Sequence, residues 1–125
     1  YAALDPYRQS CEAEYQYCQA KLAAGCDGFF SQPFFSCDQA RYWLDQLADT
    51  HVFLGLSPVI TEQSKLYWER VNHVVFSPDF SLTTQANIDL GRALIQLAND
   101  YQQNSYIMPI KIDIVQYLDG LFRCD

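Results

Sequence analysis

Apolar residues recur at steps of three and four along most of this chain, and that spacing constrains its fold more than any other feature. The first such run is Leu4, Tyr7, Cys11, Tyr15, Cys18 and Leu22. These positions trace one face of a helix. Asp5 and Pro6 suit a helix start, and Gly25 suits the left-handed residue past its end. The pattern predicts a helix over residues 5–24.

Four more segments share this spacing and carry helix-start signals. Ser36 and Gln39 form a capping box that begins a helix over 37–49. The other predicted helices run from Ser57-Pro58 to Ser77-Pro78, from Ser81 or Thr83 to Tyr101, and from Pro109 to Phe122. In the last segment Ile110, Ile112 and Ile114 also alternate as a strand would, but the residues after them break the alternation.

Two segments lack helical spacing. Residues 26–37 contain four Phe but also Gly28 and Pro33, which favours a loop with the composition of a core. Residues 51–56 are short and apolar, which is typical of a buried connection or a brief extended segment. Five helices with short links and no predicted strand pairing favour an all-α fold, an antiparallel helical bundle of four to five helices. The 125 residues then form a single helical domain over 1–125.

The five cysteines add a second constraint, because an odd number leaves at least one outside any internal set of disulfides. Cys11 and Cys18 are seven helical residues apart, about 10 Å along the axis, so they cannot pair. In a bundle, Cys18, Cys26, Cys37 and Cys124 lie at one pole. Of the three pairings these four allow, we favour a Cys18–Cys37 and a Cys26–Cys124 disulfide bond. Cys11 is then a free thiol, either buried and inert or joined to another chain.

Disulfides indicate an oxidising compartment, so we expect an extracytoplasmic protein that is secreted or lies in a bacterial periplasm. A first residue other than Met suits a mature chain after signal removal and equally suits a trimmed one. No apolar run approaches the roughly 20 residues that cross a bilayer, so we predict no direct membrane span.

The chain is acidic and aromatic-rich, with a net charge of −7 and 15% aromatic residues. Its eight Lys and Arg are scattered singly, which argues against nucleic acid and anionic membranes as partners, since both need clustered cations. The aromatic content predicts a folded core rather than an acidic tail.

The candidates for chemistry are few. His51 follows a predicted helix end, where it suits a cap, and Glu69 and His73 are spaced for a surface hydrogen bond or a metal pair. The known phosphate-binding, zinc-protease and esterase motifs are missing from the sequence. We therefore predict no metal site, no cofactor and no catalytic residues. A pair of carboxylates that meets only in the fold leaves a small enzyme as a third hypothesis.

The Phe-rich segment is the main candidate for binding. Phe29, Phe30, Phe34 and Phe35 either plug the pole of the bundle or form an exposed apolar anchor for a protein. The surrounding acidity favours a partner with a basic surface. The leading hypothesis is an exported, non-enzymatic protein-binding module that acts by occlusion or scaffolding: an inhibitor or immunity-type protein, an adaptor, or a small subunit of an extracytoplasmic assembly. The alternative is a carrier of a hydrophobic small ligand in the bundle core. The oligomeric state is not predicted.

Overall fold

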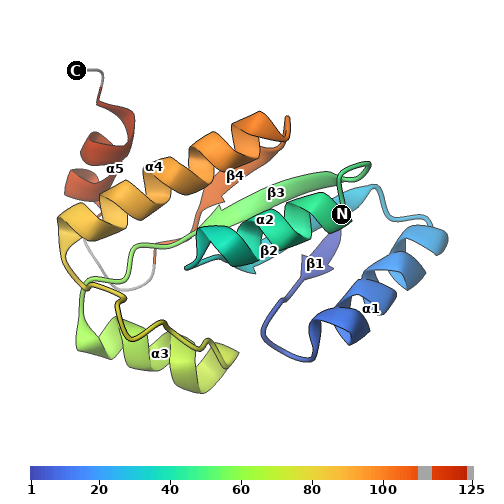
Figure 1. The fold of residues 1–125 in the computed structure, drawn as a ribbon, viewed down its shortest axis with the longest axis horizontal. Coiled ribbons are helices and arrows are strands. Elements are labelled where there is room, and N and C mark those ends of the chain that lie inside the picture. Colours follow the sequence, from blue (N-terminus) through green and yellow to red (C-terminus); the bar gives the residue numbers. More distant parts are fainter. Residues whose placement is uncertain (110–113, 124–125) are drawn as a thin grey trace.

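The computed structural model describes residues 1–109 and 114–123 and shows an α/β fold instead of the predicted all-α bundle. Within these residues there are four strands and five helices, and each strand is followed by one helix except the third, which is followed by two (Figure 1). The strands are β1 (Ala2–Leu4), β2 (Gly28–Pro33), β3 (His51–Leu56) and β4 (Asn104–Ile107). The helices are α1 (Cys11–Ala23), α2 (Cys37–Gln46), α3 (Glu62–Asn72), α4 (Thr84–Asp100) and α5 (Val115–Phe122).

The four strands form one parallel sheet whose spatial order, β1-β2-β3-β4, is their order in the chain. Each crossover therefore moves in the same direction, and right-handed crossovers then place every connecting helix on the same face of the sheet. In Figure 1, α2 lies in front of the strands, with α1 and α4 on its two sides.

The main hydrophobic core fills the space between these helices and the sheet. Alternate strand residues point into it, because side chains of a strand alternate between its two faces. The sheet contributes Leu4, Phe29, Val52, Leu54 and Leu56, and the helical side contributes Cys18, Ala40, Trp43, Leu44, Leu47, Leu94, Leu97 and Ala98. Burying a large apolar side chain of this kind stabilises the fold by about 1.5–3 kcal/mol.

The strands explain why the helical prediction was wrong. The segment predicted as a Phe-rich loop contains β2, in which Phe29 is buried and Phe30 exposed, and Pro33 is tolerated as the last residue of the strand. Residues 51–56 form β3, so the extended interpretation of that segment was the right one. The two remaining strands have three and four residues, too few to show a period of their own.

Several helices begin later than the sequence predicted. The helix predicted over 5–24 begins only at Cys11, capped by the Ser10 hydroxyl, because residues 2–4 join the sheet. The helix predicted from Ser57 begins at Glu62. The prediction of α2 is confirmed with its Ser36 cap, and that of α4 with Thr83 as the cap. Residues 110–113, where the alternating Ile110 and Ile112 fall, lie outside the described part, and α5 begins at Val115.

The predicted disulfide bonds are also wrong for the cysteines that the structure describes. Cys11, Cys18, Cys26 and Cys37 are all free, and Cys124 lies outside the described residues. The shared pole does not exist, because Cys26 precedes β2 and Cys37 follows it, at opposite ends of that strand. Cys18 is fully buried, and burial raises the pKa of its thiol to about 11, which disfavours the reactive thiolate. Cys11 is exposed at the start of α1.

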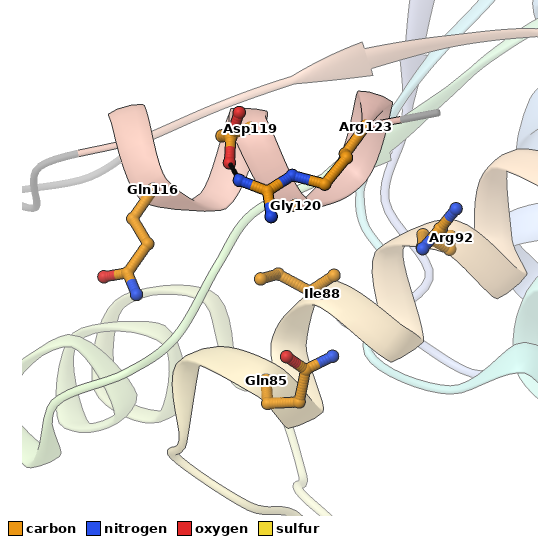
Figure 2. Close-up of a pocket in the computed structure, with 7 residues that line it drawn as sticks. All are labelled: Gln85, Ile88, Arg92, Gln116, Asp119, Gly120 and Arg123. Atoms are coloured by element: carbon orange, nitrogen blue, oxygen red, sulfur yellow. Dashed lines mark hydrogen bonds and ion pairs between the residues drawn. The ribbon is translucent and has the colours of Figure 1, made fainter. Parts of the chain in front are cut away.

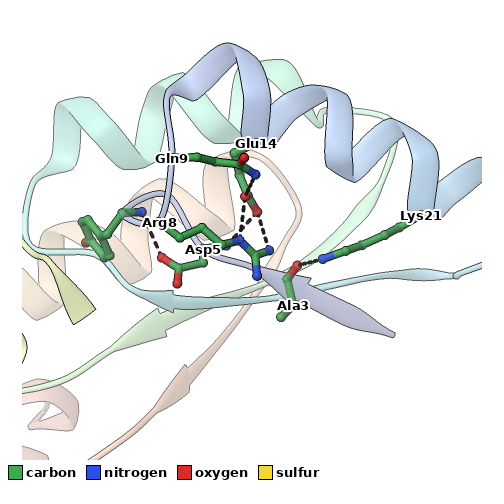
Figure 3. Close-up of polar contacts among 7 residues, drawn as sticks. Ala3, Asp5, Arg8, Gln9, Glu14 and Lys21 are labelled. Carbon is green, nitrogen blue, oxygen red and sulfur yellow. Dashed lines mark hydrogen bonds and ion pairs between the residues drawn. The ribbon is translucent and has the colours of Figure 1, made fainter. Parts of the chain in front are cut away.

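A buried carboxylate ties α1 to β1 (Figure 3). Glu14 accepts two hydrogen bonds of 2.8 Å from the Arg8 guanidinium, one of 2.7 Å from Gln9 Nε2 and one of 3.0 Å from the Asp5 backbone N–H. Burial acts to raise the pKa of Glu14, but these donors and the charge of Arg8 outweigh it, so the pKa is lowered. Lys21 Nζ also donates to the Ala3 carbonyl at 2.7 Å, so α1 holds β1 at two places.

No helix within the described residues combines the length and the apolar character needed to cross a membrane.

Candidate functional site

The side of the sheet that faces away from the helices carries a cluster of aromatic rings. We call it the aromatic face and define it as Tyr1, Phe30, His51, Phe53 and Tyr106. The rings of Phe30 and Phe53 stack with centroids 4.4 Å apart and planes 7° apart. Tyr1 meets both rings edge-on at 5.6 and 5.4 Å, and Tyr106 meets Phe30 edge-on at 5.6 Å. The centroid of His51 is 4.6 Å from that of Phe53.

This cluster is open to solvent although it consists of large rings. Phe30 is 42% exposed and Tyr1 is 58% exposed. Parallel sheets almost always have both faces covered, and clustered exposed aromatic groups usually mark a binding surface. The aromatic face is therefore the strongest candidate for a functional site among the described residues.

The polar groups of the aromatic face bond to one another or to nearby backbone. Tyr1 Oη lies 2.9 Å from His51 Nδ1, and His51 Nε2 lies 3.0 Å from Asn104 Oδ1. A neutral imidazole satisfies both contacts when the Tyr1 hydroxyl donates to Nδ1 and Nε2–H donates to Asn104. The Tyr106 hydroxyl donates to the Ser31 carbonyl, two strands away, and burial raises the pKa of Tyr106.

A glycine in β3 makes that last contact possible. Gly55 is the residue paired with Tyr106, so no side chain stands between the Tyr106 ring and β2. A Cβ at position 55 would lie 2.8 Å from the Ser31 carbonyl oxygen, closer than van der Waals contact allows. The ring of Tyr106 can therefore lie across the sheet and complete the cluster.

The carboxyl end of the sheet, where ligands bind in many parallel α/β proteins, is filled by a second aromatic cluster. Val59, Trp68 and Val74 are buried there, and Phe35 packs against Trp68, Phe76 and Phe80 with centroids 5.7, 4.9 and 6.1 Å away. The Tyr7 hydroxyl donates to the Pro33 carbonyl at 2.6 Å and closes this end further. This region is a packed core.

Three hollows among the described residues open to solvent, and one of them borders the second cluster through Phe35 and Phe80. One, of about 280 Å³ between α4 and α5, has Arg92 and Arg123 in its lining, and Arg123 pairs with Asp119 (Figure 2). A second, of about 340 Å³, lies beside β4 and includes Ile95, Ile107 and Phe122. A third, of about 260 Å³, lies near Phe80 and Leu90. The bundle core in which the carrier hypothesis placed its ligand does not exist, because the sheet and helices fill the interior.

The four Phe residues predicted as a binding anchor lie in different parts of the structure. Phe29 and Phe34 are buried, Phe35 is half-buried in the second cluster, and only Phe30 lies in the aromatic face. Of the other members of that face, His51 was interpreted as a helix cap and Phe53 was not considered for binding. Alternation of buried and open positions in β2 and β3 is the signal that could have found Phe53, but it is visible only once those segments are known to be strands.

The histidines hold other positions than predicted. His51 begins β3 and joins the aromatic face rather than capping a helix. His73 follows the last residue of α3 with φ of 61°, and both it and Glu69 are exposed. No group of three or more His, Cys, Asp or Glu among residues 1–109 and 114–123 is placed to hold a metal ion.

Comparison with known proteins adds no family: no family model matches this sequence, and no curated protein is significantly similar to it.

Proposed function

We propose that this chain is a non-enzymatic protein-binding module that acts by scaffolding, as a subunit whose aromatic face is covered by another polypeptide. The observation that carries the proposal is the uncovered side of a parallel sheet, occupied by Phe30, Phe53 and Tyr106 and rimmed by Tyr1. Removing these rings from water would supply the main free energy of association.

The shape of the aromatic face favours a protein over a small molecule. Small ligands bind in concave pockets that surround most of their surface. Phe30 and Phe53 fill the space between β2 and β3 by stacking on each other, and neither lines any of the three hollows described above. Tyr106 borders the 340 Å³ hollow beside β4, but the centre of the face, at Phe30 and Phe53, is a surface of packed rings that suits another packed surface.

The charge around the aromatic face suits a partner with basic groups at its rim. Asp27, Asp49 and Asp100 are exposed and lie just before β2, β3 and β4, so they share the amino end of the sheet. The aromatic face itself contains no Asp, Glu, Lys or Arg. Peripheral charge of one sign speeds encounter with an oppositely charged rim, while the apolar centre supplies affinity.

The extracytoplasmic location was predicted from disulfide bonds, and the four described cysteines are free. The location therefore stays a prediction without structural support.

The test is a comparison of two variants as bait in an extract of the native source. Phe30→Asp places a carboxylate in the centre of the aromatic face, while Val75→Asp adds the same charge at a residue that is 90% exposed and lies outside that face. We expect Phe30→Asp to reduce retention of a bound protein by roughly tenfold or more, and Val75→Asp to retain it as the unmodified chain does. Circular dichroism checks that both variants are folded. Equal retention by all three baits would show that the aromatic face does not bind protein.

A further inference from the structure

The strand order of this sheet is that of half a closed barrel. Eight parallel strands in chain order, each followed by a helix, close into a barrel with the helices outside and packed side chains inside. Here four parallel strands follow one another in chain order, with α1, α2 and α4 packed on one face. The aromatic face occupies the side that becomes the interior of such a barrel.

At one edge of the sheet, no other described strand pairs with the outer side of β4. The Met108 N–H bonds to the Leu56 carbonyl at 2.7 Å. Backbone groups alternate in direction along a strand, so Ser105 and Ile107 direct their N–H and C=O away from β3. β4 has neither charged residues nor proline, the usual means of protecting an edge. The 340 Å³ hollow lies along this edge and offers apolar contacts with Phe122.

The other edge of the sheet, at β1, is covered by few side-chain contacts among the described residues. Lys21 Nζ donates to the outward Ala3 carbonyl, and Lys21 is a flexible side chain at the surface. The Glu14 bond to the Asp5 N–H lies past the end of the strand. Among the described residues, a neighbouring strand therefore has to displace one side-chain hydrogen bond within β1.

Covering the aromatic face leaves few polar groups without partners. Tyr1, His51 and Asn104 already bond to one another, and the Tyr106 hydroxyl bonds to backbone. Buried polar groups cost free energy mainly when they lack a partner. Because the face carries no formal charge on its side chains, the net charge of −7 stays outside it.

The size of the face decides how it is covered. Four strands about 4.8 Å apart and roughly 10–20 Å long give a face of about 300 Å². A stable interface needs about 800 Å² from each partner, so stacking on this face alone is insufficient. Pairing along both edges adds backbone hydrogen bonds and contacts between the flanking helices.

We propose that the partner is a second copy of this chain, and that β4 of each copy pairs in parallel with β1 of the other. Two half-barrels then close into one eight-stranded barrel with both aromatic faces inside. A head-to-tail contact of this kind forms a ring when its rotation closes, and two copies complete the eight strands. This inference rests on the proposed function and names its partner. A second copy places its own Asp27, Asp49 and Asp100 at the same end of the barrel, so it does not supply the basic rim considered above, and we expect dimerisation to strengthen as added salt screens these charges.

Mass measurement by light scattering over a wide range of concentrations tests the inference. We expect the chain to have twice its 14.4 kDa mass. Ser105→Pro removes an outward N–H at a position where an edge strand tolerates proline, so we expect a folded monomer. Ser105→Thr keeps the N–H and serves as the matched control, for which we expect a dimer. Phe30→Asp places a carboxylate in the barrel interior, so we expect a monomer here too.

A second measurement keeps the inference testable if Ser105→Pro fails to fold. Hydrogen exchange of the Ser105 and Ile107 amides should be slow in the unmodified dimer and fast in monomeric Phe30→Asp. A mass of 14.4 kDa at every concentration would overturn the second copy as partner, and so would a dimer that survives both substitutions. If the chain is a monomer at every concentration, the proposed function still stands when the unmodified chain and Val75→Asp retain another protein from the extract and Phe30→Asp does not.

Discussion

The two faces of this sheet are built from alternate residues of the same strands, yet their side chains have different surroundings. On the helix-covered face, Phe29, Val52 and Leu54 are fully buried in one cluster with residues of α1, α2 and α4. On the aromatic face, Phe30 and Phe53 contact mainly other rings of that face. Both sets are apolar, so hydrophobicity alone does not distinguish the positions that are buried within the monomer from those that are open to solvent. The contrast predicts that equal truncations on the two faces have unequal effects.

The largest effect is expected on the covered face. Trp43→Ala removes a buried ring from α2 that packs against the sheet, and we expect a loss of about 3–5 kcal/mol in the free energy of unfolding. Urea denaturation followed by circular dichroism measures it. The comparison of the two faces would fail if the loss were no greater than that for Phe30→Ala.

Glu14→Gln tests the connection between α1 and β1 on the covered side. The amide keeps the volume but loses charge-assisted bonds to Arg8, so we expect a loss of about 1–3 kcal/mol at neutral pH. Because the folded-state pKa of Glu14 is lowered, its contribution is complete above the unfolded pKa of about 4.5 and declines as pH falls through the lower folded value. Unfolding measured at several pH values should show a weaker acid dependence in the variant. An unchanged slope would assign the acid sensitivity to other carboxylates.

Phe30→Ala truncates the aromatic face. Phe30 is 42% exposed, and its losses are limited to ring contacts with three neighbours, so we expect a loss of about 1–2 kcal/mol in the isolated monomer. Thermal unfolding at low protein concentration measures this loss. A loss as large as that of Trp43→Ala would show that the open rings are essential to the monomer.

Tyr106→Phe makes the smallest change, because it removes one hydroxyl and keeps the ring. We expect a loss of about 0.5–1.5 kcal/mol from the missing bond to the Ser31 carbonyl. The Phe30 ring contact should persist, which the near-ultraviolet circular dichroism spectrum checks. The expected loss assumes that the Ser31 carbonyl has no other donor in the variant. A variant as stable as the original chain would indicate that water replaces the hydroxyl.

What the sequence predicted correctly was local. The Ser36 and Thr83 caps and the periodic residues after them located α2 and α4, because caps and helical spacing involve residues close in the chain. The parallel pairing was not predictable from these signals, since Ala2 pairs with Phe29 and Phe53 with Asn104. Leu4, the last residue of β1, was interpreted as the first position of the helical pattern because its spacing to Tyr7 fits a helix.

The candidate site was predicted only in part for the same reason. Phe30 was one of four candidate anchors, but whether a Phe in this segment is buried or open depends on the face it occupies. Tyr1 and Tyr106 reach the cluster from opposite ends of the chain, and His51 was interpreted as a helix cap. Their meeting depends on strand order, which no short-range pattern contains.

The order of the strands also sets the route by which the chain acquires its structure. The segment that joins β1 to β2 is roughly half as long as the segment that joins β3 to β4, and the segment that joins β2 to β3 is roughly a third as long. Closing a longer loop costs more chain entropy, so contacts between neighbours in sequence form sooner. During synthesis from the amino terminus, β1, β2 and β3 can assemble before β4 emerges. Until β4 arrives, the outer side of β3 is the growing edge, and its apolar residues are the part of the nascent chain most in need of protection from aggregation.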